Sequence, residues 1–338
     1  MITVSAPGKV HLIGEHAVVY GEPALLVSVG RRLVVKVERS ETVRYADKRF
    51  NCLHEWTVPE ALEAADRARA LWAECSEKKD FSPLFRELKK NDFEPFRKAA
   101  VGTVLQRLGI QQGVAITIEN SGVPPGAGLG SSSSAAAALA KGISEALGKQ
   151  LNLEEVNSIA FELEQLIHGN PSGGDNTACC YGGLLWFVKG QQPVPLAGEI
   201  PFSLEIFVYT KRPEKTTGEL VQQVRQLPAE VRDPAVRAIG KGTREMREAL
   251  KQKDFRRVKD LINLAQENLA RLGVSVPEID RVHEEVKRIG GAAKGCGAVG
   301  GGMVLCWHED RELLLRTLRG LGYEPWEAPL GVEGVRVE

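Results

Sequence analysis

Apolar residues near the start of the chain alternate with polar residues or form β-branched runs. Residues 2–6 and 24–38 have this pattern, and the second segment reads ALLVSVGRRLVVKVE. A period of two places alternate side chains on one face, which is typical of strands with one buried side. The two segments are therefore predicted to form an early antiparallel sheet.

The pattern becomes helical after these strands. Apolar residues recur every three or four positions between about 59 and 108 and again at 229–290, where lysine and glutamate occupy the polar face. A separate helix is predicted to begin after Asn152, which can cap its first turn, and to end at Gly169. Further short strands are predicted at 113–119, 184–188, 204–210 and 301–306.

The length of the chain favours two lobes. With 338 residues it exceeds the size at which one hydrophobic core usually stops growing. The boundary between two closely packed lobes is predicted near residues 180–200. The mixture of helices and strands indicates an α+β fold.

Composition excludes several classes of protein. Hydrophobic residues make up 43% and charged residues 26%, as in a globular protein with a large core. Lysine plus arginine equals aspartate plus glutamate at 44 each, so no overall field attracts nucleic acid or a membrane surface. The six cysteines form no C-x-x-C pair, and the start of the chain does not have the pattern of a signal peptide. These features predict reduced thiols and a cytoplasmic location, without a nucleic-acid or membrane partner.

The strongest local motif is PPGAGLGSSSSAAAAL at residues 124–139. Glycine-rich backbone leads directly into an alanine-rich helix, and exposed amides at a helix start bind anions such as phosphate. The hydroxyls of Ser131 to Ser134 can add hydrogen bonds or ligate magnesium. The motif is neither the Walker phosphate loop nor a dinucleotide fingerprint. A flexible linker is the alternative, although a linker would not continue into a strong helix former.

Two further segments carry charged side chains beside glycines. Residues 6–21, APGKVHLIGEHAVVYG, place Lys9, Glu15 and His16 within eight positions. Lys9 can bind a phosphate or substrate oxygen, while Glu15 and His16 can hold hydroxyls. Polarity at the end of a strand is an equal alternative for this segment on its own.

The other segment is HGNPSGGDN at residues 168–176. Asp175 can orient or deprotonate an acceptor hydroxyl, or it can simply cap the next short helix. Glu164 lies one helical turn before His168 and can ligate magnesium, although a solvated glutamate is the simpler interpretation. A third glycine cluster, AKGCGAVGGGMV at 293–304, precedes a predicted buried strand and is expected to pack against the first glycine loop.

Together these segments resemble, in order and spacing, the three signature motifs of the GHMP kinase superfamily, named for galactokinase, homoserine kinase, mevalonate kinase and phosphomevalonate kinase. PGKVHLIGEHAVVYGEPAL is more similar to the mevalonate kinase branch than to galactokinases, and so are TKRPEKTT and LINLAQENLARLGVS. The resemblance covers most of the chain and is weakest at about 40–100. It implies a lobe like domain 2 of ribosomal protein S5 (residues 1–185), which holds the ATP loop, and a ferredoxin-like lobe (residues 186–338).

The resemblance also implies roles for individual residues. Asp175 is expected to be the catalytic carboxylate and Lys9 its cationic partner, with Ser132 and Glu164 as magnesium ligands. The acceptor or the phosphate path is expected to contact Glu15, His16, Thr216 and Ala298. The ATP phosphates are expected to contact Pro125, Gly126, Ala127, Gly128, Leu129, Gly130, Ser131 and Ser132.

Three positions depart from the family pattern. Val299 replaces a usual glycine and Cys296 a hydroxyl residue in the third motif. Valine tolerates a positive φ poorly, so the loop is expected to differ if that glycine served such an angle. Gly174 stands where isoleucine or valine is common, and is expected to loosen the loop of Asp175 and to open space near the substrate.

The implied reaction transfers the terminal phosphoryl group of ATP, with Mg²⁺, to the C5 hydroxyl of mevalonate. Phosphomevalonate, homoserine or a sugar remain alternative acceptors, and a non-catalytic nucleotide-binding regulator is a further alternative. The family habit, together with the apolar early strands, also suggests a homodimer.

Overall fold

Two long strands form the centre of the first lobe. In this computed structural model, which describes residues 1–119, 122–196, 200 and 206–338, β1 (Ile2–Ile13) pairs antiparallel with β2 (Ala24–Ser40). Register shifts follow Pro7 and His11. Nearly every residue of β1 is buried, because the strand is covered by helices on one side and by the second lobe near its end. The predicted early antiparallel sheet is confirmed.

Six more strands extend this sheet on both sides of the central pair. Along the main path the order is β12-β1-β2-β5-β3-β4, and β6 pairs with β2 and then with β7. β3 runs parallel to β5, whereas the other pairs are antiparallel. The added strands are β3 (Val43–Asp47), β4 (Cys52–Trp56), β5 (Gly113–Ile118), β6 (Leu184–Phe187), β7 (Val194–Pro195) and β12 (Arg336–Val337).

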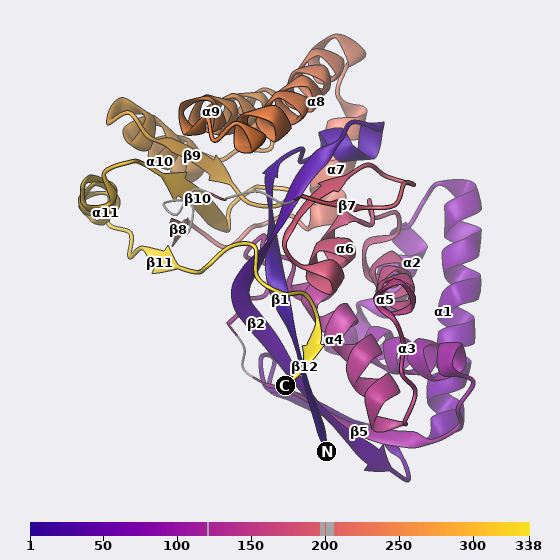
Figure 1. Ribbon diagram of the computed structural model, residues 1–338. Coiled ribbons are helices and arrows are strands. Elements are labelled where there is room, and N and C mark those ends of the chain that lie inside the picture. Colours follow the sequence, from indigo (N-terminus) through magenta and orange to yellow (C-terminus); the bar gives the residue numbers. More distant parts are fainter. Residues whose placement is uncertain (120–121, 197–199, 201–205) are drawn as a thin grey trace.

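Helices cover one face of this sheet (Figure 1). α4 packs directly on β1 and β2, because its alanines let the helix approach closely; Ala136, Ala137 and Ala140 are all buried. α5 and α6 pack on α4, and α1 and α3 form an outer pair. The helices are α1 (Val58–Lys78), α2 (Ser82–Leu88), α3 (Lys90–Leu108), α4 (Ser131–Ala146), α5 (Leu153–His168) and α6 (Gly174–Tyr181), and a short 3-10 helix spans Ala17–Tyr20.

The second lobe is an antiparallel sheet with helices packed on it. Its strand order is β11-β8-β10-β9, and it lies above the first lobe in Figure 1. The strands are β8 (Ile206–Tyr209), β9 (Ala292–Gly295), β10 (Met303–Trp307) and β11 (Trp326–Glu327). The helices are α7 (Thr217–Gln226), α8 (Ala229–Lys251), α9 (Phe255–Arg271), α10 (Pro277–Arg288) and α11 (Arg311–Gly320).

The two lobes share one hydrophobic core, which extends from β1 to β10. β6 spans the sequence boundary at residues 185 and 186 and belongs to the first sheet. The end of the chain also returns to this sheet, because β12 pairs with β1 (Figure 1). Residues on both sides of position 185, and the last strand of the chain, therefore belong to the first sheet. The domain boundary at residue 185 stays a prediction.

Local signals account for most elements, and long-range pairing accounts for the rest. Asn152 caps α5 through a capping box with Glu155, as its position predicts. The hairpin of β3 and β4 was not predicted from the sequence, and neither were β9 and α11.

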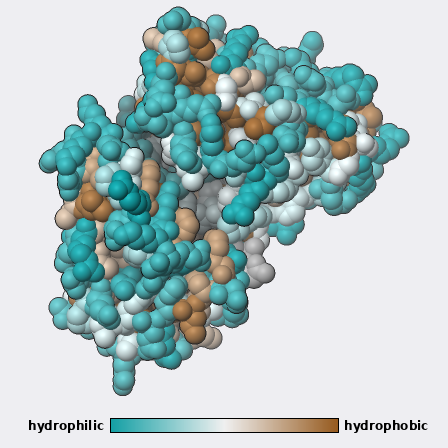
Figure 2. Space-filling view, turned by 180° about the vertical axis from the view of Figure 1, so that it is seen from behind, coloured by the Kyte–Doolittle hydropathy of each residue, from teal (hydrophilic) through white to brown (hydrophobic). Residues whose placement is uncertain are grey.

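Among the described helices, none is both long and apolar enough to cross a membrane. Seen from behind, the surface is mostly hydrophilic and is hollowed between its upper and lower parts (Figure 2).

Candidate functional site

The glycine-rich loop places the start of α4 beside Lys9. The carbonyl of Leu129 accepts a hydrogen bond from the amide of Lys9 at 2.9 Å. Gly130 caps α4 with φ +72°, and a Cβ there would lie 2.8 Å from Cγ of Lys9. Glycine therefore serves two needs at this position, a left-handed backbone and close contact with a lysine side chain. The linker alternative for this segment is wrong.

The first turn of α4 presents free amides. The first main-chain hydrogen bond of the helix runs from the amide of Ser134 to the carbonyl of Gly130 at 2.9 Å, so the amides of Ser131 to Ser133 precede the helical ladder. The side chains of Ala127 and Leu129 are buried, which leaves the backbone of the loop to face a ligand. The geometry is that of an anion site at a helix N-terminus.

Lys9 and Asp175 form an ion pair beside this helix start. Lys9 Nζ lies 2.9 Å from Asp175 Oδ2; the lysine is buried, whereas the aspartate side chain is 34% exposed. Asp175 lies in the first turn of α6, but Gly173 is the cap and no side chain caps that helix, so the capping alternative is wrong. Burial is the largest single influence and would raise the pKa of Asp175, but the charge and hydrogen bond of Lys9, together with His11 and His168, lower this pKa below its usual value. Asp175 is therefore ionised at neutral pH.

His11 is a member of this cluster that the sequence analysis missed. Its Nδ1 lies 3.5 Å from Lys9 Nζ, and the ring is buried. Burial and the charge of Lys9 hold the pKa of His11 well below its usual value, so the ring is neutral and accepts from the lysine. The available signal was the two-residue spacing from Lys9, which places both side chains on one face of β1.

Glu164 is buried next to the serines of α4. Its carboxylate accepts a hydrogen bond from the hydroxyl of Ser133 at 2.7 Å and lies 3.7 Å from Nε2 of His168. The hydroxyl of Ser132 contacts the same ring nitrogen at 3.1 Å. Burial raises the pKa of Glu164, with His168 and Ser133 acting in the opposite direction. The alternative of a solvated helix glutamate is wrong.

Oxygen donors at a phosphate-binding helix start suit magnesium. Magnesium usually takes only one or two protein oxygens together with substrate phosphates. Ser132 and Glu164 supply such a pair. Within the described part of the chain, no group of three or more histidine, cysteine, aspartate or glutamate side chains is arranged to hold a metal without a substrate.

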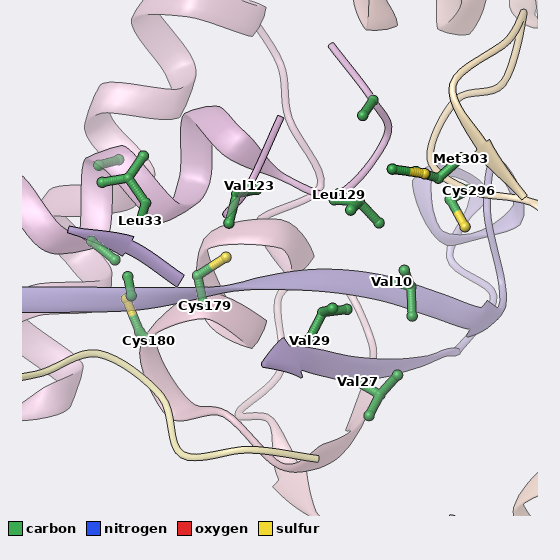
Figure 3. Packing of buried hydrophobic residues seen from close by; sticks show 14 of the residues in the cluster. Val10, Val27, Val29, Leu33, Val123, Leu129, Cys179, Cys180, Cys296 and Met303 are labelled. Carbon is green, nitrogen blue, oxygen red and sulfur yellow. The ribbon is translucent and has the colours of Figure 1, made fainter. Parts of the chain in front are cut away.

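The third glycine cluster packs against the first glycine loop, as predicted. The amide of Met303 donates to the carbonyl of Ala127 at 2.9 Å, and a Cβ on Gly128 would collide with the carbonyl of Cys296. Figure 3 shows Met303 and Cys296 beside Leu129, with Val10 of β1 nearby. Backbone contact between these two loops joins the lobes at the site.

Glu15 and His16 also reach the second lobe. The carboxylate of Glu15 forms an ion pair with Lys294 of β9, and both side chains are buried. His16 Nε2 lies 3.2 Å from the carbonyl of Ala298, while its Nδ1 is buried without a partner. His16 has φ +57° and ψ −45°, an unfavourable conformation for a residue other than glycine. Three of the four residues expected at the acceptor therefore lie together, at the contact between the lobes.

Thr216, the fourth, is not in this cluster. It is exposed, and its hydroxyl caps α7 in a capping box with Glu219. Two surface cavities of about 680 and 480 Å³ lie among α1, α2, α3 and α5, and neither is lined by a residue of the segments 6–21, 124–139, 168–176 or 293–304.

Two expectations from the family departures are corrected. Val299 adopts φ +77° itself, so the loop keeps a left-handed angle despite its β-branched side chain. Such an angle costs about 1–3 kcal/mol and persists only where the surroundings enforce it. A Cβ on Gly174 would contact Leu26 at 3.1 Å and Phe187 at 3.4 Å, so this glycine faces a filled apolar cluster and opens no space for substrate.

Comparisons with known proteins agree with this arrangement. Residues 96–183 match the family model for the N-terminal domain of GHMP kinases, and residues 246–324 match that for the C-terminal domain. Mevalonate kinases of Thermococcus sibiricus and Pyrococcus furiosus are 30% and 29% identical; each alignment covers all of this chain and 98% of the relative. A crystal structure of mevalonate kinase superposes with a TM-score of 0.79 at 26% identity, covering 98% of this chain and all of the other. The chain belongs to the mevalonate kinase family of GHMP kinases.

Proposed function

We propose that this protein transfers the γ-phosphoryl group of ATP to the C5 hydroxyl of (R)-mevalonate and produces 5-phosphomevalonate and ADP. The observation that supports this most directly is the ion pair between Lys9 and Asp175 beside the start of α4. The pair supplies a cation and an ionised carboxylate, and the adjacent helix start supplies an anion site. Phosphoryl transfer requires these three parts. Homology to mevalonate kinases over the full length supports the choice of acceptor.

The phosphates of ATP are proposed to lie on the glycine-rich loop. The backbone amides of residues 126–132 supply donors, and the dipole of α4 favours negative charge there. Ser133 and Ser134 turn their hydroxyls away, toward Glu164 and the carbonyl of Pro7. Recognition of the phosphates therefore depends mainly on the backbone.

Mg²⁺ is proposed to be held by Ser132 and Glu164 together with the phosphates. When bound, it would offset the charge of the phosphate oxygens. Glu164 has its carboxylate fixed by Ser133, so its orientation does not depend on the ion. The raised pKa of Glu164 indicates a carboxylate whose burial is not fully compensated within the chain, which fits a cation ligand.

Asp175 is proposed to accept the hydrogen bond of the C5 hydroxyl and to align it with the phosphorus atom. Its lowered pKa keeps it ionised, which suits orientation and allows it to take the proton as the bond to phosphorus forms. Lys9 is buried and charged; although burial lowers its pKa, Asp175 more than compensates, and the pKa is raised. Its charge is therefore available to the transferring group.

The acceptor is proposed to contact Glu15, His16 and Ala298, which lie together where the lobes meet. Thr216 caps α7 outside this cluster, and its contact with the acceptor or the phosphate path stays a prediction from the family resemblance. Mevalonate carries one carboxylate, whereas phosphomevalonate adds a phosphate that would require several clustered cations. Of the cations described at this site, Lys294 is already paired with Glu15. Lys9 lies beside the reacting groups and is itself paired with Asp175. Two lysines that each have a carboxylate partner are not the several clustered cations that a second phosphate would require, which favours the unphosphorylated acid.

A panel of acceptors tests this choice. We expect kcat/KM for (R)-mevalonate to exceed that for phosphomevalonate, homoserine or galactose at least about a hundredfold, which corresponds to about 2.7 kcal/mol of transition-state binding. A higher kcat/KM for any other acceptor would reject mevalonate and leave phosphoryl transfer intact. Absence of ATP consumption with every acceptor would favour a nucleotide-binding regulator.

The magnesium ligands have their own test. Ser132→Ala and Glu164→Gln are each expected to raise the magnesium concentration that gives half-maximal rate, because each removes one oxygen donor. Glu162→Gln is a matched control, since Glu162 lies on the same helix and pairs with Arg107 instead. If neither variant changes the magnesium dependence, the metal assignment is wrong.

We also propose that the protein works as a homodimer in the cytoplasm. The dimer follows the habit of the family. The six cysteines are free and five of them are buried, which supports a reducing compartment.

A further inference from the structure

Lys294 is the most deeply buried charged group that the proposed reaction does not use. It lies on β9 of the second lobe with none of its side chain exposed, and its Nζ donates to Glu15 and to the carbonyl of Gly295 at 3.0 Å. Glu15 lies in the turn two residues after β1 in the first lobe and is also buried. The ion pair therefore crosses from one lobe to the other.

We propose that Lys294 is a positioning residue that holds the carboxylate of Glu15 in place as a contact for the acceptor substrate. This inference rests on the proposed function, because it concerns how one acceptor contact is set. Lys294 itself does not touch the reacting atoms. It acts through Glu15, and it can do so only when β9 lies against the end of β1.

The charges around Glu15 explain why it needs this partner. Lys294 faces it from β9 and Lys9 from β1, while His11 and the thiol of Cys296 lie in the same electrostatic environment. Burial raises the pKa of Glu15 above its usual value, and Lys294 is the strongest influence in the opposite direction. Without Lys294, a buried carboxylate would be left largely uncompensated and would take up a proton.

The same contact couples the acceptor site to the packing of the lobes. His16 next to Glu15 contacts the carbonyl of Ala298, which lies in the glycine cluster that follows β9. Glu15 and His16 are thus both fixed by one segment of the second lobe. A lysine in this place sets the charge and the position of Glu15 at once.

Lys294→Met tests the proposal, because methionine is an unbranched side chain that can fill much of this space without the charge. At neutral pH we expect kcat/KM for mevalonate to fall about ten- to a hundredfold, as for a displaced contact in an active site. Activity should then recover as the pH is raised above neutral, because a buried carboxyl group that has lost its cation ionises only at higher pH. The wild type should change much less over this range.

The double variant Glu15→Gln with Lys294→Met separates positioning from simple stabilisation. It carries no buried charge at either position, so we expect thermal stability to return while kcat/KM stays low at every pH. Recovery of wild-type activity in the double variant would overturn the proposal. A wild-type rate and a wild-type pH profile in Lys294→Met would also overturn it, and if that variant does not fold, the double variant decides alone.

A matched control and a readout without turnover complete the test. Lys287→Met removes a lysine that pairs with Glu267 at 2.6 Å on the exposed surface of the same lobe, and should leave rate and pH profile unchanged. Infrared difference spectra should show a protonated carboxyl group in Lys294→Met that is absent from the wild type and from the double variant. This spectrum does not depend on the acceptor, so a wild type that fails to phosphorylate mevalonate would count against the proposed function and not against the role of Lys294.

Discussion

Charged side chains at this site are stabilised in pairs. Lys9 is paired with Asp175 and Lys294 with Glu15, and the two histidines nearest to them, His11 and His16, have pKa values lowered by burial. Two cations and two carboxylates in a poorly hydrated environment offset one another. Each member therefore matters for the protonation state of its partner.

Asp175→Asn tests the catalytic carboxylate. The variant should fold and bind ATP, and its turnover should fall roughly a hundred- to ten-thousandfold, the range for loss of a positioned acid or base. Steady-state kinetics together with ATP titration measure both effects. Asp310→Asn is the control, because Asp310 caps α11 far along the chain and asparagine can serve the same cap. Near wild-type turnover of Asp175→Asn would reduce this residue to a structural role.

His16 predicts a pH dependence of stability. Burial lowers the pKa of His16 to about 4, with the carbonyl of Ala298 acting in the opposite direction, so the folded state binds this proton less readily than the unfolded chain. Its contribution is present above about pH 6.5 and is lost as the pH falls through 4, about 3 kcal/mol in total. Urea unfolding between pH 4 and 7 should show a steeper acid loss for the wild type than for His16→Asn. Parallel curves would contradict the assignment.

At the scale of elements, the loop before α4 determines the geometry of the phosphate site. It ends in a left-handed glycine, and its backbone is fixed to β1 by the hydrogen bond from Lys9 to Leu129. The strand thus positions the helix start and the lysine together. A change in this loop should disturb both.

Gly130→Ala and Gly126→Ala form a matched pair. Both glycines have φ +72°, but a Cβ on Gly126 meets no atom within 4 Å, whereas on Gly130 it meets Lys9. Gly126→Ala should lower the free energy of unfolding by about 1–2 kcal/mol from the backbone alone. Gly130→Ala should lower it further, because the lysine must move. Equal thermal shifts for the two variants, measured without nucleotide, would show that the contact with Lys9 is not tight.

At the scale of the whole molecule, the site exists only because the two lobes share a core. Backbone and side-chain contacts join the segments 6–21, 124–139 and 293–304, and β12 brings the end of the chain back to β1. A perturbation that separates the lobes should therefore affect phosphate and acceptor binding together.

The assembly prediction belongs to this scale. The apolar residues of β1 and β2 are largely buried within a single chain, so these strands do not provide the interface that the sequence suggested. The family habit still predicts a homodimer. Light scattering at micromolar concentration should give twice the chain mass of 36.9 kDa. A mass of one chain at all accessible concentrations would reject the dimer.

The sequence by itself determined the features that depend on local chemistry. Glycines before an alanine-rich helix predict an anion site, and Asn152 before a helical pattern predicts a helix start, because both follow from nearest neighbours along the chain. The order of the motifs was sufficient to identify the superfamily and the reaction class. The early strands followed from their period of two.

Tertiary structure alone decided which of these features meet. The pairing of Glu15 with Lys294, which are 279 residues apart, and the burial of Glu164 depend on how the lobes pack, and no local pattern encodes that. The spacing of His11 from Lys9 is local, but the burial that keeps its ring neutral is not. The hairpin of β3 and β4 was missed because strand formation depends on the neighbouring strand as much as on residue type. The charge of a side chain and the backbone angle that a glycine permits are set by the local sequence. The burial that shifts a pKa or fixes an ion pair is a property of the packed molecule.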